Sequence, residues 1–133
     1  MSAASDYLEN KILDHILGGG DYTRPANLYY AVYTSGPTDS GGGTEVSGGA
    51  YARVAITNNN TNFPTASGGT KSNGAAVTFP TATGTWGTVT HIGIFDAASG
   101  GNLIFHAALS ASKVITTDDT LNYPIGSIVF TLA

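Results

Sequence analysis

The chain has no cysteine and little charge: only 11% of its 133 residues are Asp, Glu, Lys or Arg, against roughly 25% in ordinary soluble domains. The absence of cysteine excludes disulfide bonds, thiolate nucleophiles and zinc sites built from cysteine. Stability must therefore come from packing or from assembly. The low charge predicts a surface that does not repel neighbouring molecules.

Positive charge is also sparse. The five basic residues stand singly along the chain, at Lys11, Arg24, Arg53, Lys71 and Lys113. Without a cationic stripe to follow a phosphate backbone, nucleic acid is not an expected partner. No apolar run approaches the roughly 20 residues of a membrane span, so no membrane partner is expected. The N-terminal pattern is helical and charged where a secretory signal would be apolar, which predicts synthesis in a cytoplasm without export.

Glycine, small polar residues and tyrosine fill the chain, with 18 glycines and seven tyrosines. This composition predicts one mainly β domain over residues 1–133 with long Gly-rich loops. We expect an antiparallel β-sandwich or barrel-like fold over residues 28–132 and one short N-terminal α-helix over residues 5–17. Ser5 is the expected N-cap, and Gly18–Gly20 are expected to end the helix in a left-handed conformation. One apolar stripe follows the helix: Leu8, Ile12, Leu13, Ile16 and Leu17.

The stretch Thr88–Leu109 predicts a β-hairpin that organises the fold, with its loop at Ala97–Gly101. In the expected register Phe95 is opposite Leu103 and Gly93 opposite Phe105 on one face, while Ile94 is opposite Ile104 and Ile92 opposite His106 on the other. Because both faces are apolar, the hairpin should lie between two layers. The expected structural core is Trp86, Phe95, Leu103 and Phe105. The expected contact surface for other copies or partners is Leu8, Ile12, Tyr29, Tyr33, Ile92, Ile94 and Ile104.

Further strands are expected at Asn27–Thr34, Tyr51–Thr57, Ala75–Phe79, Lys113–Ile115, Leu121–Tyr123 and Ile128–Leu132. The first of these places three tyrosines in five residues, a pattern compatible with a sugar-stacking platform but more typical of strand and core packing. The polar segment Asn58–Gly74 is expected to be a loop anchored by Phe63. Its glycines are not a phosphate-binding loop because the Lys-Ser/Thr ending is missing.

Several side chains could act in catalysis or bind a metal ion, but each also has a simpler structural explanation. Asp39 and Glu45, in the loop Ser35–Gly49, could form an acid/base pair, but solvated carboxylates or an ion pair with Arg53 are favoured. Asp96 is expected to hold the hairpin turn rather than bind calcium. In the predicted register His91 and His106 point to opposite sides of the sheet, which excludes a shared metal. No catalytic residue, metal ligand or cofactor site is therefore predicted.

Three segments carry a family resemblance: LENKILDHILGG, LYYAVYTSGPTDSGGGTEVSGGAYARVAI and NGAAVTFPTATGTWGTVTHIGIFDAASGGNLIFHAALSASKVI. Together they resemble small bacteriophage virion proteins, commonly labelled tail fibre or head decoration proteins. GTEVSGGAYAR and GIFDAASGGNL form the paired signature, and GIFDAASGGNLI is similar to segments of phage tail-collar proteins. The resemblance implies a non-enzymatic, homo-oligomeric component of the virion.

The chain shows no internal repeat or coiled-coil segment from which a shaft could be built. We therefore expect a compact virion accessory protein, a trimer that binds the capsid or tail exterior. Capsid decoration is slightly favoured over a globular fibre or collar piece. The alternative is a tail-fibre receptor-binding module that stacks host glycans on Tyr29, Tyr30, Tyr33 or Tyr51. An enzyme is not expected.

Overall fold

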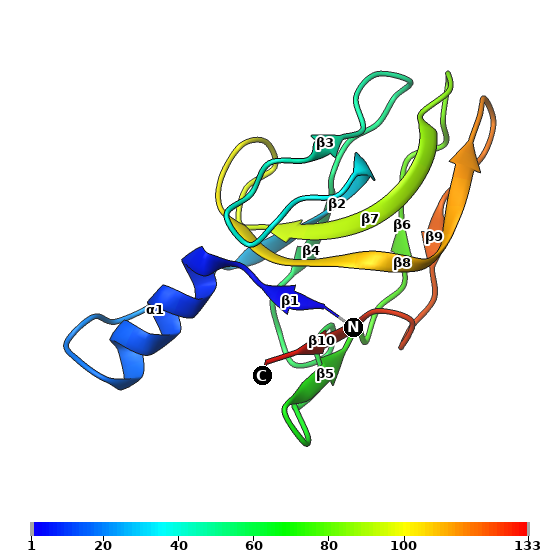
Figure 1. Cartoon of the computed structure of the whole chain (residues 1–133). Coiled ribbons are helices and arrows are strands. Elements are labelled where there is room, and N and C mark those ends of the chain that lie inside the picture. The colour runs from blue at the N-terminus through cyan, green and yellow to red at the C-terminus, as the bar shows by residue number, and fades with distance from the viewer. Residues whose placement is uncertain (1, 133) are drawn as a thin grey trace.

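The computed structural model describes residues 2–132, which form antiparallel β-strands and one helix (Figure 1). The elements are β1 (Ala3–Ala4), α1 (Asp6–Ile16), β2 (Asn27–Ser35), β3 (Thr44–Glu45), β4 (Val54–Thr57), β5 (Thr70–Ser72), β6 (Val77–Thr78), β7 (Gly87–Phe95), β8 (Leu103–Ile115), β9 (Asn122–Tyr123) and β10 (Val129–Thr131). The prediction of a mainly β fold with one short helix is confirmed.

One large sheet has the order β1-β8-β7-β2-β3, and β4 pairs with β2 beside β3. Two small ladders, β5 with β10 and β6 with β9, lie against it. Figure 1 shows the long strands β7 and β8 curving across the molecule, with the β5–β10 ladder below them. The arrangement is sandwich-like, as predicted, because the small ladders and their loops cover one face of the large sheet.

The central hairpin is present, but its predicted register is wrong beyond the turn. Phe95 pairs with Leu103 as expected, whereas Ile94 pairs with Phe105, Gly93 with His106 and Ile92 with Ala107. The cause is a β-bulge: one extra residue, Ile104, stands in β8 between the pairs formed by Phe95 and Ile94. The bulge moves the pairing by one position as far as His91 with Ala108, and a second irregularity between Val89 and His91 shifts the rest of β8 further.

The sheet is apolar on both faces, as predicted for the hairpin. The larger cluster contains Tyr30, Val32, Ile92, Ile94 and Ile104 from the sheet, packed against Phe63, Val77, Phe79, Trp86, Leu121, Ile128 and Phe130. The smaller cluster on the other face contains Ala31, Tyr33, Phe95 and Leu103. Phe105 does not share the face of Phe95, because the bulge turns it toward Phe130 in the larger cluster, with ring centroids 5.4 Å apart.

Burial within the chain removes several of the predicted contact residues from the surface. Trp86, Phe95 and Leu103 are buried and Phe105 is half-buried. Five residues of the predicted contact surface are buried within the chain itself: Leu8, Tyr33, Ile92, Ile94 and Ile104. Ile12 and Tyr29 are half-buried. The prediction is wrong for the five, because the two layers that cover the hairpin come from the same chain.

Helix α1 begins as predicted, with the Ser5 side chain accepting a hydrogen bond from the Leu8 N–H at 3.2 Å. Its end is different: the N–H of Leu17 bonds to Leu13 O, and none of Gly18–Gly20 has a positive φ. The helix projects from the side of the β structure (Figure 1). Only Leu8 of the apolar stripe is buried in the body.

The polar segment Asn58–Gly74 contains a strand that the sequence analysis missed. Residues Thr70–Ser72 form β5, which pairs with β10, the last strand of the chain. Pairing runs from Thr70 with Thr131 to Ser72 with Val129. This ladder brings Phe63 and Phe130 together over the large sheet, with ring centroids 6.0 Å apart.

Candidate functional site

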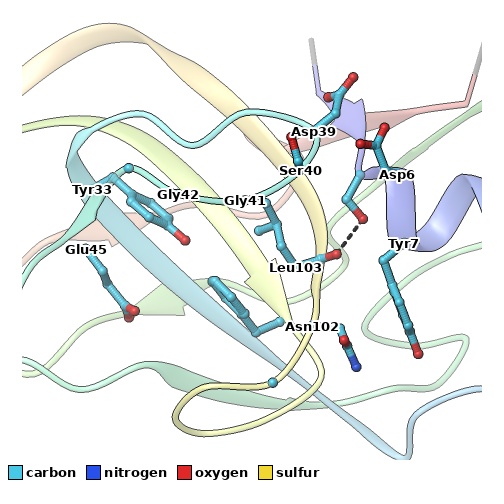
Figure 2. Close-up of a pocket in the computed structure, with 14 residues that line it drawn as sticks. Asp6, Tyr7, Tyr33, Asp39, Ser40, Gly41, Gly42, Glu45, Asn102 and Leu103 are labelled. Atoms are coloured by element: carbon cyan, nitrogen blue, oxygen red, sulfur yellow. Dashed lines mark hydrogen bonds between the residues drawn. The ribbon is translucent and has the colours of Figure 1, made fainter.

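An open, polar pocket of about 590 Å³ lies at one side of the large sheet and is shown in Figure 2. Three segments meet there: the start of α1, the loop over residues 39–43, and the end of the β7–β8 hairpin loop. Its lining is Ser5, Asp6, Tyr7, Tyr33, Asp39, Ser40, Gly41, Gly42, Gly43, Glu45, Phe95, Gly101, Asn102 and Leu103. We call it the polar pocket.

Hydrogen bonds donated by Ser5 and accepted by Asp39 fix the geometry of the polar pocket. The Ser5 N–H bonds to Ile104 O at 2.9 Å, and its hydroxyl donates to Leu103 O, the dashed contact in Figure 2. Asp39 accepts twice: its carbonyl from the Asp6 N–H at 2.9 Å, and its carboxylate from His106 Nε2 at 2.7 Å. The helix start, the Gly-rich loop and β8 are thus joined at one point.

Glu45 belongs to a second, more buried network behind the pocket. Arg53 donates to both of its carboxylate oxygens, from Nε at 2.9 Å and Nη2 at 2.8 Å, and Tyr51 Oη donates at 2.7 Å. The remaining Arg53 nitrogen donates to the carbonyls of Ala97 and Gly100 at 2.8 Å each. The predicted Glu45–Arg53 pair is confirmed, and it also holds the hairpin loop.

The network determines the charge of Glu45. Burial raises the pKa of its carboxyl, but hydrogen bonds from Arg53 and Tyr51 and the charge of Arg53 outweigh burial and leave the pKa below its ordinary value. Glu45 is therefore ionised at neutral pH and has no proton to give. Asp39 and Glu45 do line the same pocket, but each is already paired with a different cationic or imidazole side chain.

Of the four tyrosines proposed for sugar stacking, Tyr30, Tyr33 and Tyr51 pack in the core, and Tyr29 is half-buried. Tyr30 and Tyr33 are buried, and burial followed by the charge of Glu45 raises the pKa of Tyr33 to about 12. The ring of Tyr51 stacks on Phe79 with centroids 6.2 Å apart and meets Trp86 edge-on at 5.3 Å. A platform that uses these three rings is excluded because their faces are covered by the protein.

The two histidines lie on one face of the sheet, so the prediction that they point to opposite sides is wrong. The bulge places His106 opposite Gly93, two residues from His91, and alternate residues of a strand share a face. They have separate partners: His106 bonds to Asp39, and His91 Nδ1 lies 2.8 Å from Thr90 Oγ1. Within residues 2–132, no group of three or more His, Asp or Glu side chains could hold a metal ion.

Asp96 holds the hairpin turn, as predicted, although its partner is six residues away. Its carboxylate accepts from the Asn102 backbone N–H at 2.7 Å and from the Asn102 side chain at 2.9 Å. Asn102 thereby reaches the polar pocket. The contributions of Asp6, Tyr7 and Asn102 to this pocket were not predicted; the one sequence signal was the length of the Gly-rich loop that closes it.

A second hollow is apolar and lies between the large sheet and the β5–β10 ladder. It has a volume of about 330 Å³, and we call it the apolar groove. Its apolar lining includes Leu28, Phe63, Ile94, Ile104, Phe105, Phe130 and Leu132. Lys71 stands at its edge, and its ammonium donates to Phe63 O at 3.4 Å.

A family model described as Podophage GP4 fiber I protein gp80 matches residues 3–131. The chain belongs to this family. No curated protein sequence matches it. Membership identifies the chain as a phage fibre protein, a structural component of the virion, and confirms the resemblance to bacteriophage virion proteins. The described helix α1 has 11 residues, too short to cross a bilayer.

Proposed function

We propose that the chain is a globular, non-enzymatic piece of a phage fibre, which associates with copies of itself and with other structural proteins of the particle. The family match over nearly the whole chain carries this proposal. It favours a fibre position over the capsid decoration that the sequence analysis preferred. The described fold supports an end or collar piece of the fibre. Its one helix is short and its strands pack into a single body, with no repeated unit from which a shaft could be built.

The state of the pocket carboxylates supports a role without catalysis. An acid/base pair needs two groups whose pKa values are pushed apart, one of them upward. In the polar pocket the pKa of Glu45 is lowered by Arg53 and Tyr51 despite its burial, and Asp39 is bonded to His106. Both carboxylates therefore serve to hold loops in place.

Immunogold labelling of intact phage tests the proposal. Antibodies raised against the purified chain should place gold particles on fibres at the tail or collar. Labelling spread over the whole capsid would support decoration instead, and particles without any label would overturn the proposal. Light scattering coupled to size-exclusion chromatography should give the mass of two or more chains.

A second candidate function is recognition of a host surface glycan in the polar pocket. The pocket is open and is lined by two aspartates, the Asn102 amide and the Tyr7 hydroxyl (Figure 2). Carboxylates and amides accept and donate the hydrogen bonds that sugar hydroxyls require.

Asp6 offers a clean test of glycan binding. Within residues 2–132, no side-chain hydrogen bond or ion pair holds its carboxylate, so Asp6→Asn should leave the fold unchanged. If the pocket binds a glycan, a glycan array should show a signal that Asp6→Asn weakens and Asp14→Asn, on the same helix outside the pocket, does not. Silence of the unaltered protein on a broad array would reject this candidate.

A further inference from the structure

The outer half of helix α1 presents an apolar face that the chain does not cover. Leu13 and Ile16, and Leu17 at the C-cap, are spaced to lie on one side of the helix and are 54%, 68% and 76% exposed. The inner half is fixed differently: Leu8 is buried and Ile12 packs against the larger core cluster. An amphipathic helix gains stability by burying its apolar face, so the outer half lacks its partner.

The helix cannot reach the apolar groove of its own chain. Its start is bound to β8 through Ser5, and its inner half packs on the body, so the outer half extends away from the sheets (Figure 1). The groove on the same chain is also open. An engineered cavity of about 150 Å³ holds one benzene ring, so a groove of about 330 Å³ has room for roughly two aliphatic side chains.

The charges around the two surfaces are opposite. The exposed side of the helix carries Glu9, Asp14 and one cation, Lys11, and Asp21 follows it, so acidic residues outnumber basic ones. The groove has Lys71 at its edge, and an adjoining hollow that shares Asn58, Phe63 and Lys71 with the groove is also lined by Arg24. No described residue that lines either hollow is acidic. Two such helices would repel one another, whereas a helix and a groove attract.

We propose that the outer half of α1 in one copy docks into the apolar groove of a neighbouring copy, with Leu13, Ile16 and Leu17 facing the groove. This rests on the proposed function, in which copies associate. The contact joins two different surfaces, so each copy gives one helix and receives another. Repetition of a contact of this kind closes a ring where the rotation between copies permits it.

Light scattering coupled to size-exclusion chromatography tests the helix side. Ile16→Glu and Leu17→Glu change exposed positions and should leave the circular dichroism spectrum unchanged. Each should raise the dissociation constant of the oligomer by about tenfold or more, because burial of one aliphatic side chain is lost. Val114→Glu, at an exposed apolar residue near the far end of β8, is the matched control and should leave the mass unchanged.

Mixing distinguishes helix-into-groove docking from a contact between like surfaces. Ala66→Glu, an exposed position in the groove, should weaken the oligomer in the same way, and each variant alone is examined at a concentration where it is monomeric. A mixture of Ile16→Glu and Ala66→Glu chains retains one intact helix and one intact groove per pair, so it should form a dimer that grows no further. A mixture that stays monomeric, or an oligomer unaffected by the single changes, would overturn the inference. An oligomer unaffected by the single changes would refute the helix-into-groove contact but not the proposed fibre role. Phage particles that no antibody labels would refute the fibre role but not the contact between copies.

Discussion

The guanidinium carbon of Arg53 lies 3.7 Å from the centroid of the Phe95 ring. The side chain therefore rests on the last residue of β7 while its nitrogens bind Glu45 and two carbonyls of the following hairpin loop. One buried arginine thus joins β3, the segment before β4, and the turn of the central hairpin. Its planar fork suits this task, because it can serve a carboxylate and two carbonyls while its face covers an aromatic ring.

Replacing Arg53 should destabilise the fold strongly. Arg53→Ala removes a side chain that is only 7% exposed and leaves the Glu45 carboxylate without its cation, so we expect a loss of about 3 kcal/mol. Arg53→Lys should recover part of this loss, since it keeps the charge but not the fork. Lys113→Ala, at an exposed position, should change the free energy of unfolding by less than about 0.5 kcal/mol. Urea denaturation measures all three, and a loss of under about 1 kcal/mol for Arg53→Ala would contradict the assigned role.

The Glu45 carboxyl should make the fold sensitive to acid. Its pKa is lower in the folded chain than its ordinary value of 4.5, so its contribution is complete above pH 4.5 and is lost as the pH falls through the folded value. Glu45→Gln should therefore be less stable than the unaltered protein at neutral pH. The difference should shrink as the pH falls below 4.5. Equal differences at neutral and acidic pH would show that the charge of Glu45 does not stabilise the fold.

Removal of the hydroxyl group should change the stability of the fold in opposite directions at two tyrosines. The Tyr30 hydroxyl is buried without a hydrogen-bond partner among the described residues, and burial raises the pKa of this group. Tyr30→Phe removes an unsatisfied polar atom and should raise stability by about 1 kcal/mol. Tyr51→Phe removes a hydroxyl that donates to Glu45 and accepts from the Val32 N–H, and should lower it by about 1–2 kcal/mol. Thermal unfolding of the pair checks both signs, and a loss for Tyr30→Phe would indicate a bound water at that hydroxyl.

Two glycines differ in whether the structure leaves room for a side chain at their position. A Cβ added to Gly74 would lie 2.2 Å from Thr61 O and 2.8 Å from Pro64 Cδ, so Gly74→Ala forces backbone to move. We expect it to cost about 1–3 kcal/mol. A Cβ added to Gly19 meets nothing within 4 Å, and its φ is not in the left-handed region. Gly19→Ala should be neutral or stabilise by up to about 1 kcal/mol by restricting the unfolded chain. Similar melting temperatures for both variants would be inconsistent with this packing.

Local signals predicted much of the fold. The N-cap at Ser5 follows from a short hydroxyl side chain before an apolar helical stripe, and the strand expected at Asn27–Thr34 is β2. The Glu45–Arg53 pair followed from the need of a buried guanidinium for a nearby carboxylate. Each of these depends on residues close together in the chain.

The register of the central hairpin could not be predicted by the same reasoning. Leu103, Ile104 and Phe105 are apolar in succession, so the sequence shows no break in alternation at the bulge. The pairing of β5 with β10 joins segments about 60 residues apart and carries no local pattern. The polar pocket depends on the bulged part of the hairpin, since Leu103 lines it and the pairing of β1 with β8 at Phe105 and His106 sets the position of the helix start.

The attachment of Ser5 to β8 has a mechanical consequence. If neighbouring copies hold the outer half of α1, tension in the fibre enters each domain at Ser5, where the backbone and the hydroxyl bind adjacent carbonyls of β8. Asp6 adds a third bond, to the carbonyl of Asp39. Since these three bonds stand together at the root of the helix, a pull on the helix loads them at the same time. Stretching a single molecule by its helix should therefore give one abrupt rupture rather than gradual unravelling.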